Sequence, residues 1–239
     1  MKSKHYSVFP IELEGDRLNQ ENWERLRVDL ENDGGGYSIK NSAEAFEDAC
    51  RNAGSMYRTA ARKICEALRE QGAARAVSFG VGAGVLEGLI KANMPTLKLI
   101  CTDYTEKALQ KLETVFLACD ETRTFDMLNG DYGVWKDIDA AILFRVSTEF
   151  DFDIWKSIFA RMSSAGLRRV IFIPTELATT SIMLREKALM LYHALQGKKN
   201  YFCGWLYSEK TIERMWLGAY EIKKKEYFEK TAIYVLERV

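Results

Sequence analysis

Three glycines at alternate positions, in the stretch SFGVGAGVLE from Ser78 to Glu87, follow one short apolar run and precede another. A glycine loop between a strand and a helix lets a ligand approach the backbone more closely than any Cβ would allow, and the helix offers the positive end of its dipole. The stretch therefore predicts a strand, a ligand-binding loop and a helix. It favours folds in which strands and helices alternate.

The chain after Gly72 shows this alternation, with short β-rich apolar runs between longer helical ones. The pattern predicts strands at 76–79, 97–102, 124–127, 139–144 and 169–173, and helices at 84–92, 105–118, 152–162 and 179–195. A short helix opened by Ser208 and two strands, 220–225 and 231–237, complete the chain. We expect an α/β fold: a doubly wound, mostly parallel seven-stranded sheet with a C-terminal antiparallel hairpin.

The first seventy-two residues differ in character. Apolar residues near helical spacing predict a helix over 17–31 that ends at the triple glycine 34–36, and an amphipathic helix from Asn41 to about residue 71. We expect residues 1–72 to form a helical N-terminal extension, packed as a lid on a main domain of residues 73–239.

Composition disfavours several function classes. Basic and acidic residues number 34 each, so no net positive field attracts nucleic acid. A membrane span needs about 18 consecutive apolar residues, and the sequence has no such run. The five cysteines are widely spread and the chain has only two histidines, which indicates reduced thiols and no metal site. We expect a cytoplasmic protein with no nucleic-acid partner.

Three ligand classes compete for the glycine loop. A nucleotide P-loop needs GxxxxGK followed by Ser or Thr, which the sequence lacks. A dinucleotide fingerprint needs GxGxxG or a closing Ala, and Val85 stands at that position. The spacing present is GxGxG, at Gly80, Gly82 and Gly84. With a helix and then a strand that ends in Asp103, it resembles the Rossmann-like class I S-adenosylmethionine (AdoMet)-dependent methyltransferases.

This resemblance implies AdoMet as the cofactor. It implies that the three glycines admit the methionine end, that Asp103 accepts hydrogen bonds from the ribose, and that Asp131 accepts one from the adenine amino group. Tyr104 and Tyr132, the next residues along the chain, join the same predicted site. Asn-Gly-Asp is a strong turn on its own account, so ordinary turn chemistry is the alternative interpretation of Asp131.

Ser78 departs from the family pattern. An acid commonly stands two residues before the first glycine, where it helps to hold the amino group of the methionine moiety. A serine can accept the same hydrogen bond but brings no charge. Three alternatives follow: a site with lower cofactor affinity, a site in which another residue helps, or an AdoMet-binding fold without catalysis that serves as a regulatory or partner subunit.

The candidates for catalysis come from the ends of later strands. Methyl transfer is an in-line displacement for which the protein mainly aligns the acceptor and excludes water, and a hydroxyl acceptor usually needs a base or a metal. The candidate bases are Glu149 and Glu176, after the fourth and fifth predicted strands. Arg145, Ser147 and, beside the triple glycine, Tyr37 are the candidates for substrate binding.

The substrate class is narrowed by motifs that the sequence lacks. After the fourth strand it reads FRVST, not the Asn/Asp-Pro-Pro-aromatic run of the family's base- and amide-modifying members, and it has no Pro-Cys pair as in the cytosine C5 enzymes. The resemblance therefore implies methyl transfer to a small-molecule acceptor. Aminocarboxypropyl transfer and nicotinamide-dependent oxidoreduction remain alternatives. The aromatic run 201–207 predicts core or a contact within a homo-oligomer.

Overall fold

The computed structural model describes residues 2–9, 12–29 and 38–239. Its main body is a seven-stranded sheet of strand order β4-β3-β2-β5-β6-β9-β8. The strands are β2 (Arg75–Phe79), β3 (Lys98–Asp103), β4 (Glu121–Thr124), β5 (Ala140–Phe144), β6 (Arg169–Ile173), β8 (Tyr220–Phe228) and β9 (Thr231–Arg238). The first five are parallel, and β9 lies antiparallel between β6 and β8. The predicted fold class, including the C-terminal antiparallel hairpin, is confirmed.

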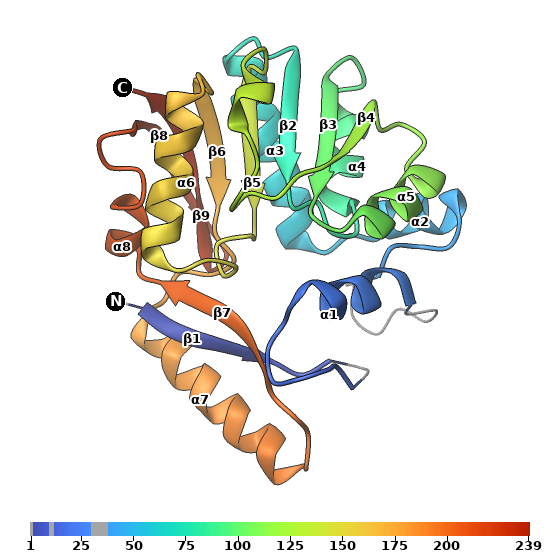
Figure 1. Ribbon diagram of the computed structural model, residues 1–239, viewed down its shortest axis with the longest axis vertical. Helices are drawn as coiled ribbons and strands as arrows, with labels where there is room; N and C mark the ends of the chain where they lie inside the picture. Colours follow the sequence, from blue (N-terminus) through green and yellow to red (C-terminus); the bar gives the residue numbers. More distant parts are fainter. Residues whose placement is uncertain (1, 10–11, 30–37) are drawn as a thin grey trace.

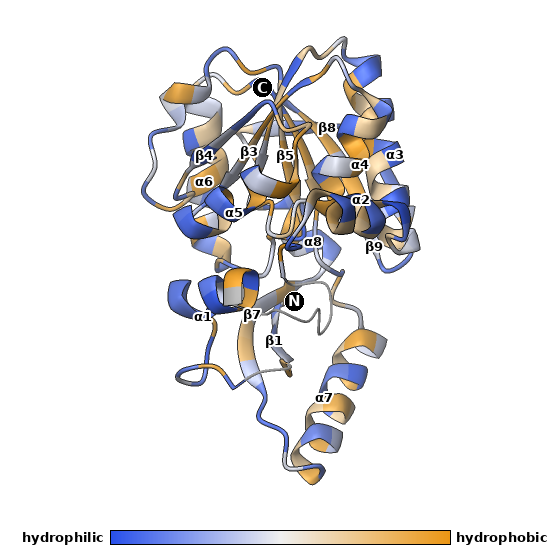
Figure 2. Ribbon diagram, turned by 90° about the vertical axis from the view of Figure 1, so that its right-hand side faces the viewer, coloured by the Kyte–Doolittle hydropathy of each residue, from blue (hydrophilic) through white to orange (hydrophobic). Residues whose placement is uncertain are grey.

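Helices cover both faces of this sheet and make three layers (Figure 1). One face carries α2 (Ala43–Arg51), α3 (Ser55–Glu70), α4 (Val85–Asn93) and α5 (Glu106–Val115), and the other carries the 3-10 turn η2 (Tyr132–Trp135), α6 (Phe152–Ser164) and α8 (Glu209–Glu213). Because successive strand residues point to opposite faces, Val77 and Phe79 of β2 enter one core and Ala76 enters the other. Figure 2 shows these central strands as strongly hydrophobic.

A smaller unit lies beyond the carboxyl ends of the parallel strands. β1 (Lys2–Ser7) pairs antiparallel with β7 (Tyr201–Tyr207), and α7 (Thr180–Leu195) packs beside β1. Figures 1 and 2 both show α7 standing apart from the large sheet. β1 corrects the expectation of a wholly helical N-terminal extension. Its sequence, KSKHYS, has no apolar alternation, and its partner strand comes from the far end of the chain.

The described N-terminal segment also contains helices, as expected, but in shorter pieces. α1 (Gln20–Glu24) is capped by Asn19 and continues as a π-helical turn, η1 (Arg25–Asp29). The single helix expected from Asn41 is two helices, α2 and α3, separated at residues 52–54, and Ser42 provides the N-cap of α2. The spacing of the apolar residues alone predicts one continuous helix. Polar Asn52 and flexible Gly54 stand where the helix is interrupted.

β4 lies earlier in the chain than the predicted strand 124–127. Its residues, ETRT, form a polar edge strand, whereas Phe125 and Met127 after it are buried in loop conformation within the aromatic core. The apolar pattern therefore marked a buried loop rather than the strand. This shift matters because it changes which acid follows the end of β4.

Candidate active site

The glycine loop joins β2 to α4 at the carboxyl end of the sheet. The carbonyl of Thr102 accepts a hydrogen bond from the N–H of Gly80 at 2.8 Å, which ties the loop to β3. Gly84 has a φ of +75°, a left-handed conformation that glycine adopts without strain. A Cβ at Gly80 would come within 2.7 Å of Val146 Cγ1, and one at Gly84 within 2.6 Å of Leu112 Cδ1. These two glycines therefore allow close packing within the protein.

Gly82 faces a side chain of the N-terminal segment instead. A Cβ built on Gly82 would lie 2.8 Å from Nη2 and 3.0 Å from Cζ of Arg27, so the guanidinium rests directly on the glycine backbone. Arg27 also lies over the ring of Trp23, with 4.8 Å between its Cζ and the ring centroid. The bare backbone of Gly82 thus accommodates a flat cationic group at the point where the sequence predicts a ligand.

Asp103, the last residue of β3, organises the loop. Its Oδ2 accepts a hydrogen bond from Gly82 N at 3.2 Å, and its Oδ1 accepts from Thr105 N at 3.2 Å and Thr105 Oγ1 at 2.9 Å. An ionised carboxylate has about four acceptor positions. One position on Oδ2 of this half-buried side chain is therefore left for a further donor.

A buried pair of side chains lies below the loop. The hydroxyl of Ser78 donates to Oε1 of Glu87, in the first turn of α4, over 2.7 Å. Glu87 is 2% exposed, and its Oε2 has no hydrogen-bond partner in the part of the chain that the structure describes. Burial raises the pKa of Glu87 to about 7; the bond from Ser78 lowers it and the charge of Asp103 adds to the rise.

The sequence interpretation passed over Glu87, although it stands in the same glycine-rich stretch. The available signal was its place in the first turn of a helix. Side chains there lean back toward the N-terminus, which brings position 87 against the strand residue Ser78.

Tyr104 is the point where charges from three strand ends meet. Burial raises the pKa of its phenol, the charges of Glu149, Asp103 and Asp126 add to the rise, and Arg27 opposes it. These side chains follow β5, β3 and β4, while Arg27 comes from η1. The carboxyl edge of the sheet and the N-terminal segment therefore form one electrostatic site.

Glu149 lies between the N-terminal segment and β7. Trp23 donates a hydrogen bond to its carboxylate, and the charge of Glu149 acts on Cys203 of β7. Exclusion of water by the surrounding protein raises the pKa of Glu149 above the ordinary carboxyl range, Arg27 opposes the rise, and Asp103 adds to it. The side chain is nonetheless exposed, so solvent moderates the rise.

Further contacts hold the N-terminal segment over this edge. Lys107 of α5 forms an ion pair with Glu24 of α1. Lys111 Nζ donates to the carbonyl of Val28 at 2.9 Å, and Gln20 Nε2 reaches the carbonyl of Tyr104 at 3.4 Å. These contacts hold the helix α1 and the turn η1 beside α5 and Tyr104. A role of this segment as a lid stays a prediction. Tyr37, the residue predicted to act within that lid, lies outside the described residues.

Glu176, the other predicted base, belongs to a different network. Its carboxylate is 2.6 Å from Nη2 of Arg185, and the same nitrogen is 2.9 Å from Glu186 Oε1. Glu186 Oε2 in turn lies 2.8 Å from His5 Nδ1. This chain of charged groups ties the loop after β6 to α7 and β1. A role for Glu176 as a base stays a prediction.

Arg145 and Ser147 lie at the end of β5 in unlike surroundings. The side chain of Arg145 is exposed, and its φ of +58° is a left-handed conformation that is sparsely populated by residues other than glycine and tends to occur at functional sites. Ser147 is 2% exposed, and its Oγ accepts from Thr175 N at 2.9 Å. The hydroxyl of Ser147 therefore joins the ends of β5 and β6.

Asp131 and Tyr132 lie at the turn η2. Asp131 caps this turn, as the alternative of turn chemistry expects. Tyr132 is 2% exposed, its hydroxyl donates to Met127 O at 2.8 Å, and its ring packs on that of Phe125 in the aromatic core. Of the acids that follow β4, the one whose charge raises the pKa of Tyr104 is Asp126, not Asp131. The sequence prediction passed over Asp126 because it placed residues 124–127 inside the strand.

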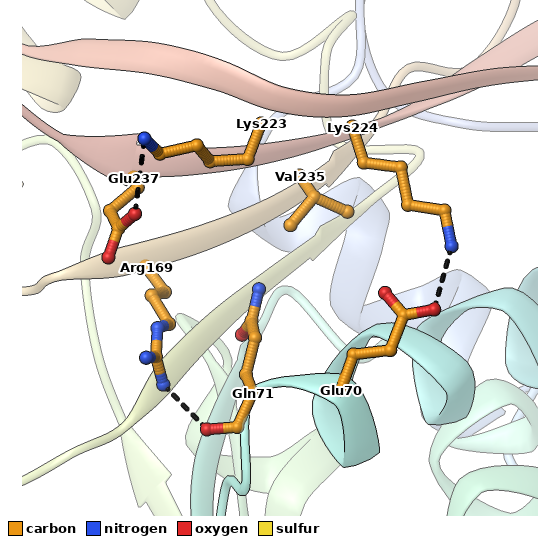
Figure 3. A pocket seen from close by; sticks show the side chains of 7 residues that line it. All are labelled: Glu70, Gln71, Arg169, Lys223, Lys224, Val235 and Glu237. Atoms are coloured by element: carbon orange, nitrogen blue, oxygen red, sulfur yellow. Dashed lines mark hydrogen bonds and ion pairs between the residues drawn. The ribbon is translucent and has the colours of Figure 1, made fainter.

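A surface recess of about 380 Å³ opens at the other end of the sheet (Figure 3). Its lining includes Arg169, the first residue of β6, and therefore belongs to the amino ends of the parallel strands. Its charges are paired: Lys224 Nζ lies 2.9 Å from Glu70, and Arg169 donates to Gln71 O at 2.9 Å. Open α/β sheets bind ligands at the carboxyl ends of their strands, so the glycine loop, not this recess, lies at the edge that favours ligand binding.

No three His, Cys, Asp or Glu side chains in residues 2–9, 12–29 and 38–239 gather as metal ligands would. None of the helices in these ranges combines the length and the apolar character that a bilayer crossing requires.

No model of a known protein family matches the sequence, and a search of curated proteins finds no relative. Three solved methyltransferases share the fold. The mitomycin 7-O-methyltransferase MmcR matches with a TM-score of 0.58 and 18% identity over 81% of this chain and 60% of its own. Magnesium protoporphyrin IX methyltransferase from Synechocystis PCC 6803, with bound S-adenosylhomocysteine, matches with 0.57 and 17% over 83% and 96%. Human N-acetylserotonin methyltransferase, in complex with AdoMet, matches with 0.53 and 12% over 82% and 56%.

These structural similarities confirm the Rossmann-like methyltransferase fold that the glycine loop and Asp103 implied. The chain spans 60% of the length of the mitomycin enzyme and 56% of that of the human enzyme.

Proposed function

We propose that the protein binds AdoMet at the glycine loop and transfers its methyl group to a small-molecule acceptor. The observation that carries the proposal is the pairing of the loop with Asp103, whose carboxylate accepts from Gly82 N at the end of β3. The order of the strands, with β9 antiparallel between β6 and β8, supports it. Two of the similar structures hold AdoMet or S-adenosylhomocysteine.

The residues at the loop fit such a cofactor. Asp103 keeps an acceptor position that suits a ribose hydroxyl, and the Arg27 guanidinium on Gly82 shows that the glycine backbone accommodates a flat group. Asp126, rather than Asp131, is the acid after β4 whose charge reaches Tyr104, and we propose it for the adenine amino group. AdoMet, when bound, supplies a methyl group already activated by a positive sulfur. What the chain itself must do is bind, orient and exclude water.

Glu149 is the residue that we propose as the general base. It stands beside Tyr104 and the N-terminal segment, and its raised pKa makes it a stronger base than an ordinary carboxylate. In the ionised form it would accept the proton of an acceptor hydroxyl. Trp23, which donates to this carboxylate, and Arg27 would hold the side chain in place while α1 and η1 exclude water. Arg145, exposed at the end of β5, is proposed to contact the acceptor.

A small acceptor is supported by two observations. The names of the similar enzymes describe methyl transfer to mitomycin, N-acetylserotonin and magnesium protoporphyrin. Basic and acidic residues balance at 34 each, so the chain offers no net charge to a nucleic-acid substrate.

Isothermal titration with AdoMet, S-adenosylhomocysteine and NADH tests the proposal. We expect micromolar binding of the first two and none of NADH. Asp103→Ala should weaken AdoMet binding by about tenfold or more, because a charged acceptor at the loop is lost. Failure of both sulfur compounds to bind would overturn the proposal. During turnover, release of S-adenosylhomocysteine indicates methyl transfer, whereas methylthioadenosine would indicate transfer of the aminocarboxypropyl chain.

A further inference from the structure

Two acids flank the glycine loop, and their hydrogen bonding is unequal. Asp103 accepts three hydrogen bonds from Gly82 and Thr105. Glu87 is almost fully buried, accepts a hydrogen bond from the Ser78 side chain, and keeps Oε2 without a partner among the described residues. A hydrogen bond from its own backbone N–H also lowers its pKa. A buried carboxylate oxygen without a donor is costly, so such an oxygen needs an explanation.

The groups that face Glu87 come from three neighbouring elements. β2 contributes the Ser78 hydroxyl, and β3 contributes Cys101 and the carboxylate of Asp103. α2 contributes Cys50, whose pKa is raised to about 11 by burial, with the charge of Glu87 adding to the rise. The charge that raises the pKa of Glu87 is thus that of another acid, Asp103.

Two cations of the same region are held by other groups. Lys91, one turn further along α4, donates to Asp120 at 2.8 Å and to the carbonyl of Leu97 at 2.9 Å. Arg27 lies over Trp23 and rests on Gly82. Two carboxylates next to one loop favour a ligand that brings positive charge to it.

We propose that Glu87 binds the ammonium group at the amino-acid end of the ligand, in place of the acid absent at position 78, and that its ionisation links ligand binding to pH. This inference rests on the proposed function. Ser78 is a positioning residue: it holds Oε1 of Glu87 and leaves Oε2 to the ligand.

The direction of the pH dependence follows from the pKa of Glu87, which is about 7 in the protein alone. Below pH 7 the carboxyl is mostly protonated, and an ammonium group beside it favours the ionised form. Binding therefore releases a proton at low pH, and affinity falls as the pH decreases through 7. Above pH 7 the carboxylate is already ionised and the affinity levels off.

The experiment compares two ligands by isothermal titration between pH 5.5 and 7.5. S-adenosylhomocysteine carries the amino-acid end, and methylthioadenosine lacks it. Titrations in two buffers of different ionisation enthalpy count the protons released. The range ends at 7.5 because an α-amino group itself titrates near pH 7.7–8.0, by an approximate reference value. Glu106→Gln, at an acid in the first turn of the neighbouring helix α5, is the matched control.

For wild-type protein we expect the affinity for S-adenosylhomocysteine to fall by about tenfold or more from pH 7.5 to 5.5, with release of up to about one proton. Glu87→Gln should weaken this ligand by about tenfold at pH 7.5 and remove most of the pH dependence, while methylthioadenosine binds as before and reports that the variant is folded. Ser78→Ala should move the midpoint of the pH dependence upward, since the bond from Ser78 lowers the pKa of Glu87. Glu106→Gln should behave as wild type.

The outcomes separate the two proposals. If wild-type protein binds neither ligand at any pH, the proposed function fails, and this inference fails with it. If wild-type protein binds both ligands, but Glu87→Gln keeps the wild-type affinity and proton count for S-adenosylhomocysteine, the proposed role of Glu87 is wrong. The proposed function then still stands.

Discussion

Glu149 and Glu176 occupy corresponding places in the sequence, each in the segment after a parallel strand, yet their surroundings differ. Glu149 lies beside the N-terminal segment, where it receives a hydrogen bond from Trp23, and its pKa is raised. Glu176 is held by Arg185 at 2.6 Å in a network that leads to α7 and β1. A strand end brings an acid to the correct edge of the sheet, and its partners then decide whether the carboxylate is available for chemistry.

The largest expected effect separates these two acids. Glu149→Gln should lower kcat by about a hundredfold or more, the usual contribution of a positioned general base, while the affinity for AdoMet changes little. Turnover is measured as AdoMet-dependent release of S-adenosylhomocysteine, with the best acceptor from a screen of phenols and other small hydroxyl compounds. Glu176→Gln is the matched control. Wild-type turnover in Glu149→Gln would contradict the role of Glu149 as the general base.

Arg27 offers a second test of Glu149, because its positive charge lowers the pKa that burial raises. Arg27→Gln removes this positive charge, so the pKa of Glu149 should rise further. A base acts when it is ionised, and the acidic limb of the kcat–pH profile should therefore move to higher pH. A shift of one unit lowers kcat by about tenfold on that limb. The titration of Glu149, followed by carboxyl-carbon NMR and identified with Glu149→Gln, should move in parallel.

An unchanged limb in Arg27→Gln would mean that Glu149 does not titrate in the catalytic step. Saturating AdoMet is needed throughout, since Arg27 also rests on Gly82 at the loop. Lys107→Gln, which removes an ion pair of the same N-terminal segment with Glu24, is the control for a loosened lid. It should leave the limb in place.

The core of the fold could be predicted from the sequence because its signals are local. The strand 169–173 coincides with β6. The predicted strands differ from β2 and β5 by one residue at one end, and from β3 by one residue at each end. The glycine loop and Asp103 follow from the same periodicity. Glu149 could be placed at the sheet edge because it comes shortly after β5.

The parts that sequence reasoning missed depend on long-range contacts. β1 pairs with β7, which lies almost two hundred residues later in the sequence. The polar sequence of β1, KSKHYS, does not indicate a strand or a partner for it. The backbone of β7 passes next to Glu149, since Trp205 N donates to Thr148 O at 3.0 Å. Glu87 was missed because the family pattern directs attention to position 78 rather than to the helix that leans over it.

Asp126 and Asp131 repeat the comparison after β4, with a smaller effect. Both acids accept hydrogen bonds within turns, Asp126 from Leu128 N and Asn129 Nδ2 at 2.8 Å each, and Asp131 from Gly133 N at 2.8 Å. Of the two, Asp126 is the acid whose charge acts on Tyr104 at the site. Asp126→Asn should weaken AdoMet and S-adenosylhomocysteine by about fivefold, as the loss of about 1 kcal/mol from one hydrogen bond would produce. Asp131→Asn should leave both affinities unchanged. Titration calorimetry of the two variants measures both affinities. If Asp131→Asn weakens binding and Asp126→Asn does not, Asp131 is the acid that binds the adenine amino group.

Glu176→Gln itself carries the smallest expected effect, on stability rather than turnover. Arg185 and Glu176 are 35% and 21% exposed in their side chains, so solvent weakens their attraction, and loss of the pair should cost about 1 kcal/mol at most. For a chain of this size that is roughly 2–4 °C in Tm. Thermal unfolding should show this decrease, and a larger one in Arg185→Gln, because that substitution also breaks the contact with Glu186. If Glu176→Gln instead loses turnover while Glu149→Gln keeps it, the partnered acid performs the chemistry, and proximity to the glycine loop is the wrong criterion for the base.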